Sequence, residues 1–203
     1  MAFPDSSKPI ATCVAADCAD CPVRGRIHCH FRFGDLAHFL AIGLPGLLVG
    51  GAGVLGAGVG HLVFWVALMV GFFGFIEIRV MCAHCPHYAE KGRTLGCWAN
   101  HGAPKIWNYR PGPMSAVEKG VFFFGLAAIW GYPLPLLVTG GKWFLLVLYT
   151  LTNAGFFLAL RLFLCARCMN FACPLNTVDG PTRELFLQRH PSVARHWTPP
   201  DTD

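Results

Sequence analysis

Charged side chains are missing from one long stretch in the first half of the chain. Residues 36–76, which lie between Asp35 and Glu77, are 41 residues without Asp, Glu, Lys or Arg. A helix needs about 20 apolar residues to cross a bilayer. The stretch therefore predicts two membrane-spanning helices, at 36–56 and 60–80, joined by a glycine-rich turn. Asp35 is the expected N-cap of the first helix, because Asp side chains favour that position.

A second uncharged region predicts two further spanning helices. Lys119 and Lys142 enclose 22 uncharged residues, and 143–160 adds 18 more. The glycine pair just before Lys142 predicts a tight turn between the two helices. Ser115 and Glu118 have the spacing of a capping box, which marks the beginning of the third helix.

The overall composition agrees with a membrane protein. The hydrophobic fraction is 54%, and only 13% of residues are charged, whereas soluble domains carry about 25% charged residues. The mean hydropathy is +0.48, which excludes a disordered chain. We therefore predict an all-α membrane protein, a four-transmembrane-helix bundle of two parallel-repeat helical hairpins with a small Cys-rich, metal-stabilised cytoplasmic cap. The expected segments are 1–35, 36–80, 81–118, 119–164 and 165–203.

The basic residues predict the orientation of the bundle. Of the 16 Lys and Arg residues, 15 lie on the side of the termini and the middle loop, and Lys142 alone lies on the other side. By the positive-inside rule, both termini and the middle loop face the cytoplasm, in the inner or plasma membrane. Residues 1–35 have no apolar core, which a cleaved signal peptide would need.

All ten cysteines lie outside the predicted spans and on the predicted cytoplasmic side. They form three groups, and each group has a CxxC pair followed by a single cysteine: Cys13, Cys18, Cys21 and Cys29; Cys82, Cys85 and Cys97; Cys165, Cys168 and Cys173. A reducing cytosol argues against disulfides. Three CxxC pairs are more than free structural thiols would supply by chance, so we expect metal ligation.

Two arrangements of metal sites are compatible with this spacing. Two Cys-Ala-x-Cys elements follow the second and fourth helices, each shortly after an Arg, which suggests a repeat of the two hairpins. In the inter-segment arrangement, which we prefer, one site is Cys82, Cys85, Cys165 and Cys168, and a second is Cys18, Cys21 and Cys29 with Cys97 or Cys173. In the local arrangement, one site is Cys82, Cys85, Cys97 and His101.

The identity of the bound metal distinguishes two predicted functions. Tetrathiolate sets bind both zinc and iron–sulfur clusters, and we expect zinc because it is the commoner structural metal. Zinc would make the protein a membrane scaffold or partner-binding module for a cytoplasmic protein. The alternative is an iron–sulfur electron-transfer component of a membrane oxidoreductase, with a quinone as its candidate membrane partner, because the spacing from Cys13 to Cys21 matches the opening of a plant-type ferredoxin pattern.

Other motifs assign no further chemistry. The chain has no phosphate-binding glycine loop, no Ser/His/Asp set and no HExxH, so it is not assigned as an enzyme. The stretch 98–114, which carries two Trp, a Tyr and two cations, is too short and too poor in Lys and Arg to indicate a nucleic-acid partner. A salt bridge to Arg79, or snorkelling to the nearby interface, is the expected explanation of Glu77 in a span. The GxxxG spacing of Gly46 and Gly50 predicts close helix packing within one chain, and 181–190 predicts a short amphipathic tail helix.

Overall fold

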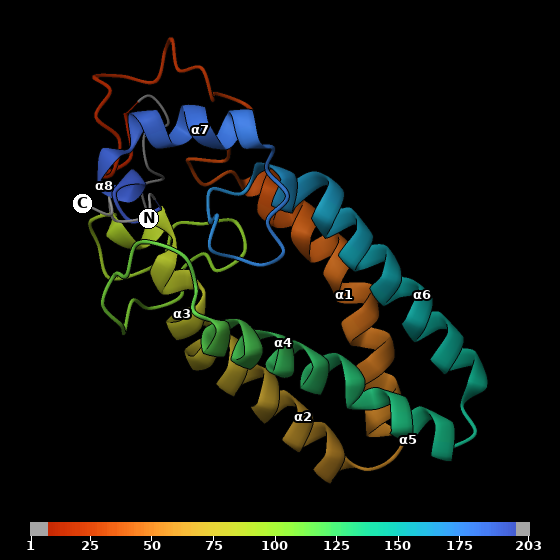
Figure 1. Cartoon of the computed structure of the whole chain (residues 1–203). Helices are drawn as coiled ribbons and strands as arrows, with labels where there is room; N and C mark the ends of the chain where they lie inside the picture. Colours follow the sequence, from red (N-terminus) through yellow and green to blue (C-terminus); the bar gives the residue numbers. More distant parts are fainter. Residues whose placement is uncertain (1–7, 198–203) are drawn as a thin grey trace.

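The computed structural model describes residues 8–197, so residues 1–7 and 198–203 of the first and last expected segments lie outside the described residues. The described chain is helical, and its extended residues form only isolated bridges rather than strands. The prediction of an all-helical fold is confirmed. Figure 1 shows four long helices, with most of the irregular chain gathered at one end.

The four long helices are each apolar enough to cross a membrane, which confirms the four predicted spans. The first long helix is α1 (Phe33–Leu55). The second is made of α2 (Val59–Gly71), η1 (Phe72–Ile76), α3 (Glu77–Val80) and η2 (Cys82–His84), and the third of α4 (Ala116–Gly131) and α5 (Pro133–Thr139). The fourth is made of α6 (Trp143–Ala159), η4 (Leu160–Leu164) and η5 (Cys165–Arg167). The second and fourth helices continue past the ends of their apolar runs. Each therefore includes the first cysteine of its CxxC pair.

The helices associate in pairs, as Figure 1 shows. Helix α1 packs along α6, and the second long helix lies beside α4. The end of the bundle that carries residues 8–32, 85–115 and 168–197 is called the loop end below. It also holds η3 (Pro86–Ala89), α7 (Gly180–Arg189) and α8 (Pro191–Ala194).

Glycines allow α1 and α6 to approach closely. A Cβ atom on Gly46 would lie 2.6 Å from Asn153 Oδ1, and one on Gly50 would lie 2.7 Å from Tyr149 Cε2. Real Cβ atoms essentially never come so close, so these positions require glycine. The prediction that this GxxxG pair packs within one chain is confirmed.

Two predictions of helix starts can be compared with the structure: the capping box at Ser115 is present, whereas Asp35 is not an N-cap. Ser115 Oγ accepts a hydrogen bond from the Glu118 N–H at 3.2 Å, and Glu118 Oε2 accepts one from the Ser115 N–H at 2.9 Å, which confirms the capping box. The predicted N-cap role of Asp35 is wrong, because α1 begins two residues earlier, at Phe33. Asp35 lies in the first turn and directs a carboxylate oxygen to within 3.5 Å of His28 Nδ1.

The tail helix covers the N-terminal segment. The predicted helix at 181–190 is present as α7, and its N-cap Asp179 accepts a hydrogen bond from the Thr182 N–H at 2.9 Å. Phe186, on α7, is fully buried in a cluster that also contains Val23, Cys85 and other apolar residues. The tail therefore packs onto the cysteine-bearing segments.

Candidate metal centre

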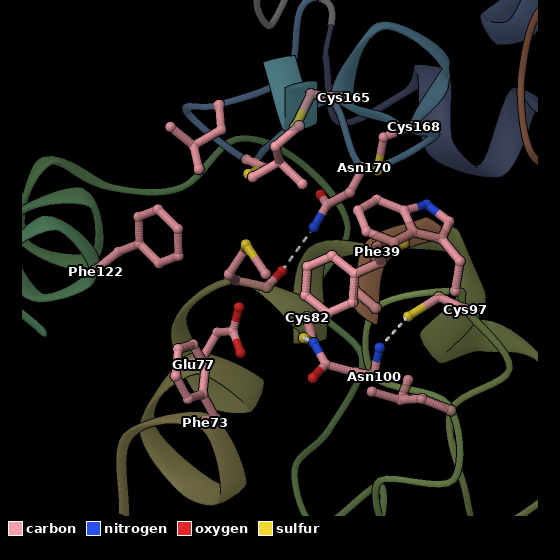
Figure 2. A pocket seen from close by; sticks show the side chains of 18 of the residues that line it. Phe39, Phe73, Glu77, Cys82, Cys97, Asn100, Phe122, Cys165, Cys168 and Asn170 are labelled. Carbon is pink, nitrogen blue, oxygen red and sulfur yellow. Dashed lines mark hydrogen bonds between the residues drawn. The ribbon is translucent and has the colours of Figure 1, made fainter. Parts of the chain in front are cut away.

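A cavity of about 140 Å³ lies where the four long helices meet the loop end. Six of the ten cysteines line it, and we call it the six-cysteine cavity: Cys82, Cys85, Cys97, Cys165, Cys168 and Cys173. Its remaining wall is mostly aromatic and aliphatic, with Phe39 from α1, Phe73 from η1 and Phe122 from α4. Figure 2 shows labelled cysteines above and below the central space, with the phenyl rings beside it.

The two Cys-Ala-x-Cys elements have the same local conformation. In each, a 3-10 turn closes with a hydrogen bond from the N–H of the last cysteine to the carbonyl of the first, at 3.0 Å for Cys85 to Cys82 and 3.3 Å for Cys168 to Cys165. The last cysteine is extended in both, with φ −78° and ψ 139° at Cys85 and φ −81° and ψ 130° at Cys168. Each turn is preceded in the same helix by a π-helical segment. The structural similarity supports the repeat inferred from the sequence.

Backbone amides act on four of the sulfur atoms. The N–H groups of His87, Ala99, Asn170 and Leu175 lower the thiol pKa of Cys85, Cys97, Cys168 and Cys173 respectively, although burial raises each pKa by more. An N–H donor stabilises a thiolate more than a neutral thiol. Hydrogen bonds to sulfur also help to set the reduction potential of thiolate-bound clusters. The local backbone therefore favours the anionic form of these sulfurs, but less strongly than burial opposes it.

Asn100 joins two of the cysteines. Its backbone N–H donates to Cys97 Sγ at 3.2 Å, and its side-chain Nδ2 donates to Cys82 Sγ at 3.2 Å. Sequence reasoning missed Asn100. Its position between Cys97 and His101 was the only available signal, because the contact to Cys82 depends on tertiary structure.

The thiols are neutral unless a cation is present. Burial raises the pKa of Cys97 to about 11, and burial together with the neighbouring Cys173 sulfur raises the pKa of Cys168 to about 12. Burial also raises the pKa of Cys173 to about 12. A metal ion would supply the positive charge that makes the thiolate form favourable. The chemistry that this cavity supports is therefore metal–thiolate binding.

Among residues 8–197, Glu77 is the one carboxylate side chain that lines the six-cysteine cavity. Its residue is 8% exposed, and among the described residues its Oε2 atom has no hydrogen-bond partner. The expected salt bridge to Arg79 is wrong, since Arg79 Nη1 lies 3.5 Å from Glu118 Oε1 instead. Residues two apart lie on different sides of a helix. Figure 2 shows the Glu77 carboxyl group directed toward the space between Phe122 and Cys82.

The other four cysteines form a separate group beside this cavity. Cys18, Cys21 and Cys29 line a second hollow of about 510 Å³, and Cys13 packs with Cys21 and Cys29 against the core beneath α7. We call these residues the four-cysteine group. Burial raises the pKa of Cys29 to about 12, with the Cys21, Cys13 and Cys18 sulfurs adding to the increase. These four thiols are therefore within electrostatic range of one another.

The structure distributes the candidate ligands between these two places. Cys97 and Cys173 lie on the six-cysteine cavity with Cys82, and not with the four-cysteine group. His101 does not line the cavity; its ring stacks on Phe31 with a centroid distance of 3.9 Å. All ten cysteines are free thiols. Among residues 8–197, no three Cys, His, Asp or Glu side chains already lie close enough to hold one ion.

Comparison with protein-family models, with curated proteins and with solved structures finds no match to this chain. The geometry of the two thiol groups, rather than a relative, therefore carries the functional argument.

Proposed function

We propose that this membrane protein is an iron–sulfur electron-transfer component, with one centre in the six-cysteine cavity. The observation that carries the proposal is the convergence of six thiols, from two distant parts of the chain, on one buried space of about 140 Å³. Each centre would take up and release one electron between ferric and ferrous iron. The four-cysteine group would hold a second centre.

Two features favour a cluster over a single zinc ion. A closed zinc site uses four ligands around one ion at about 2.3 Å from sulfur, whereas this cavity offers six thiols around a larger space. The backbone N–H groups of His87, Ala99, Asn170 and Leu175, which act on the sulfurs of Cys85, Cys97, Cys168 and Cys173, are donors of the kind that tune cluster potentials. The apolar, largely aromatic wall would raise the effect of each of these donors, because electrostatic interactions are stronger in a low dielectric.

We also propose that the loop end faces the cytoplasm. The support is the distribution of basic residues, because Lys142 is the one Lys or Arg of the chain that belongs to the turn at the opposite end, before α6. A cluster at the loop end would then lie where a soluble cytoplasmic donor meets the bilayer. The protein would pass electrons between that donor and a carrier in the membrane.

The test is the metal content of the protein purified without oxygen in detergent. We expect a brown protein that contains iron and acid-labile sulfide. A colourless protein that contains zinc would contradict the electron-transfer function and support the scaffold. A protein with neither metal and with ten alkylatable thiols would contradict both.

Variants distinguish the two arrangements of ligands. Cys168→Ser should remove the centre of the six-cysteine cavity, because Cys168 lines the cavity and is near Cys85 and Cys173. The matched control is His101→Ala, because His101 is exposed and does not line the cavity, and this variant should retain the centre. Loss of iron in His101→Ala with full iron in Cys168→Ser would instead support a site within the middle loop.

A zinc scaffold is the second candidate function. The specific observation in its favour is the matched pair of 3-10 turns at Cys82–Cys85 and Cys165–Cys168, since paired CxxC elements are typical of structural zinc. In that function the ion would join the second and fourth long helices. The loop end would then serve as a docking site for a cytoplasmic protein.

A further inference from the structure

A buried histidine, His28, lies between the two thiol groups. His28 is 6% exposed, and it lines both the six-cysteine cavity and the hollow of the four-cysteine group. Among the described residues, neither Nδ1 nor Nε2 of His28 has a hydrogen-bond partner, and Asp35 Oδ2 also lacks one. A buried polar atom without a partner costs about 1–3 kcal/mol. His28 Nδ1 and Asp35 Oδ2 lie close enough to become each other's partner, which leaves His28 Nε2 as the buried polar atom that needs a partner from elsewhere.

The backbone of His28 is fixed between the two CxxC elements. Its N–H donates to the Arg167 carbonyl at 2.8 Å, and Arg167 lies inside the second CxxC element. Its carbonyl accepts a hydrogen bond from the His87 ring, two residues after Cys85. These contacts hold the imidazole against the same space that the thiols surround.

Asp35 supplies the partner that a metal-binding histidine needs. Its Oδ2 atom lies 3.5 Å from His28 Nδ1, too poorly aligned for a hydrogen bond in this arrangement. A small rotation of the ring would make that bond and leave Nε2 with a free lone pair. Metal-ligating histidines commonly donate their second nitrogen to a carboxylate, which fixes the tautomer and the ring orientation.

We propose that His28 Nε2 is a ligand of the metal centre in the six-cysteine cavity and that Asp35 orients the ring. Imidazole binds iron as well as zinc. The proposal rests on the proposed metal–thiolate function and adds a nitrogen ligand to it. Because Cys29 belongs to the four-cysteine group, the adjacent residues His28 and Cys29 would connect the two centres through one peptide unit. That link would provide a short path for an electron.

The test is electron paramagnetic resonance of the reduced full-length protein, purified without oxygen after labelling with ¹⁵N-histidine. We expect a hyperfine coupling to nitrogen in the wild type, its loss in His28→Ala, and its retention in His38→Ala, an exposed histidine of α1 that lines neither site. His28→Cys restores a ligand without nitrogen, so it should keep its iron but lose the coupling and show a lower reduction potential. Asp35→Asn should keep the coupling and lose iron to a chelator about 10–100-fold more readily.

The outcomes separate this inference from the proposed function. Iron without nitrogen coupling in the wild type, or an unchanged coupling in His28→Ala, overturns the His28 ligand and leaves the iron–sulfur function standing. If the resident metal is zinc, it is replaced by Co²⁺ and the ¹⁵N coupling is measured on that ion. Loss of the coupling in His28→Ala would then support the His28 ligand even though the iron–sulfur function is wrong. A wild-type protein without any metal overturns both.

Discussion

The side-chain amide of Asn100 donates a hydrogen bond to the sulfur of Cys82, 18 residues earlier in the chain, at 3.2 Å. The backbone N–H of Asn100 donates to Cys97 at the same distance. One residue of the middle loop therefore positions a sulfur on the end of the second long helix and another within the loop. This arrangement gives Asn100 a direct influence on any metal held there.

Replacement of Asn100 by Ala should weaken metal binding without unfolding the protein. The change removes the Nδ2 donor to Cys82 but keeps the backbone donor to Cys97. Loss of such a partner of a ligand typically weakens metal binding about 10–100-fold, and loss of a donor to sulfur also lowers the reduction potential of a cluster. Iron retention against a chelator and a potentiometric titration measure both effects. Asn108→Ala, at an exposed position of the same loop, is the control and should change neither.

Replacement of Gly46 by Ala should loosen the contact between α1 and α6. The new Cβ would overlap Asn153 Oδ1 at 2.6 Å. Asn153 cannot move aside freely, because it accepts a hydrogen bond from Trp130 Nε1 at 2.7 Å and donates to the Tyr149 carbonyl at 2.7 Å. We expect a loss of about 1–3 kcal/mol, measured as the free energy of unfolding in mixed detergent micelles.

The matched control for that variant is Gly51→Ala on the same helix. Its Cβ would meet its nearest neighbour, a carbon of Trp65, at an ordinary 3.6 Å. Ala favours a helix over Gly by about 1 kcal/mol, so this variant should be neutral or slightly more stable. Equal losses in Gly46→Ala and Gly51→Ala would contradict the close contact.

The docking of α7 should weaken in acid. His190 is 2% exposed, its ring stacks on Phe186 at 3.8 Å, and burial lowers its pKa to about 4. The unfolded chain, with a histidine pKa of about 6.5, therefore takes up a proton first as the pH falls. The stability from neutral His190 is complete above pH ~6.5 and decreases by about 1.4 kcal/mol per pH unit down to about pH 4.

Hydrogen exchange of the α7 amides, corrected for intrinsic exchange rates, measures this dependence. His190→Phe should abolish the His190 part of the slope between pH 6.5 and 4. His38→Phe, which changes an exposed histidine, should keep the wild-type slope. A slope that is the same in His190→Phe and in the wild type would show that another group controls the docking.

Labelling in intact cells should report which side of the membrane each end faces. Thr139 and Arg93 are both exposed, the first at the end of α5 and the second in the middle loop. A membrane-impermeant maleimide should label Thr139→Cys in intact cells, and should label Arg93→Cys only after the membrane is opened. The reverse pattern would place the thiols outside the cytoplasm. The wild type, which keeps its native cysteines, provides the background.

Local patterns predicted the membrane helices well, because the cost of a charge in lipid leaves a mark in the sequence itself. The absence of charge before Glu77 and the capping box at Ser115 each depend on neighbours in the chain, so both features were readable without a structure. The partner of Glu77 was not readable in this way. Arg79 is two residues away in sequence, but the helix turns it toward Glu118.

The candidate centre was predictable only in part for the same reason. The CxxC spacing indicated which residues could bind a metal, since each pair is a local element. The spacing could not indicate that Asn100 contacts Cys82, or that His28 lies beside the same cavity, because these contacts join segments that are distant in sequence. Polar residues whose role depends on tertiary neighbours carry no periodic signal.

The π-helical segments Phe72–Ile76 and Leu160–Leu164 have a consequence for how such a site changes over time. A π turn is an α-helix with one additional residue, and one residue of an α-helix corresponds to about 100° of rotation. Deletion of a single residue from either segment would turn the following CxxC element away from its counterpart while leaving the span long enough for the membrane. Insertion or deletion of one codon can thus create or abolish a metal site shared by the CxxC elements of both hairpins, while the protein still inserts into the membrane.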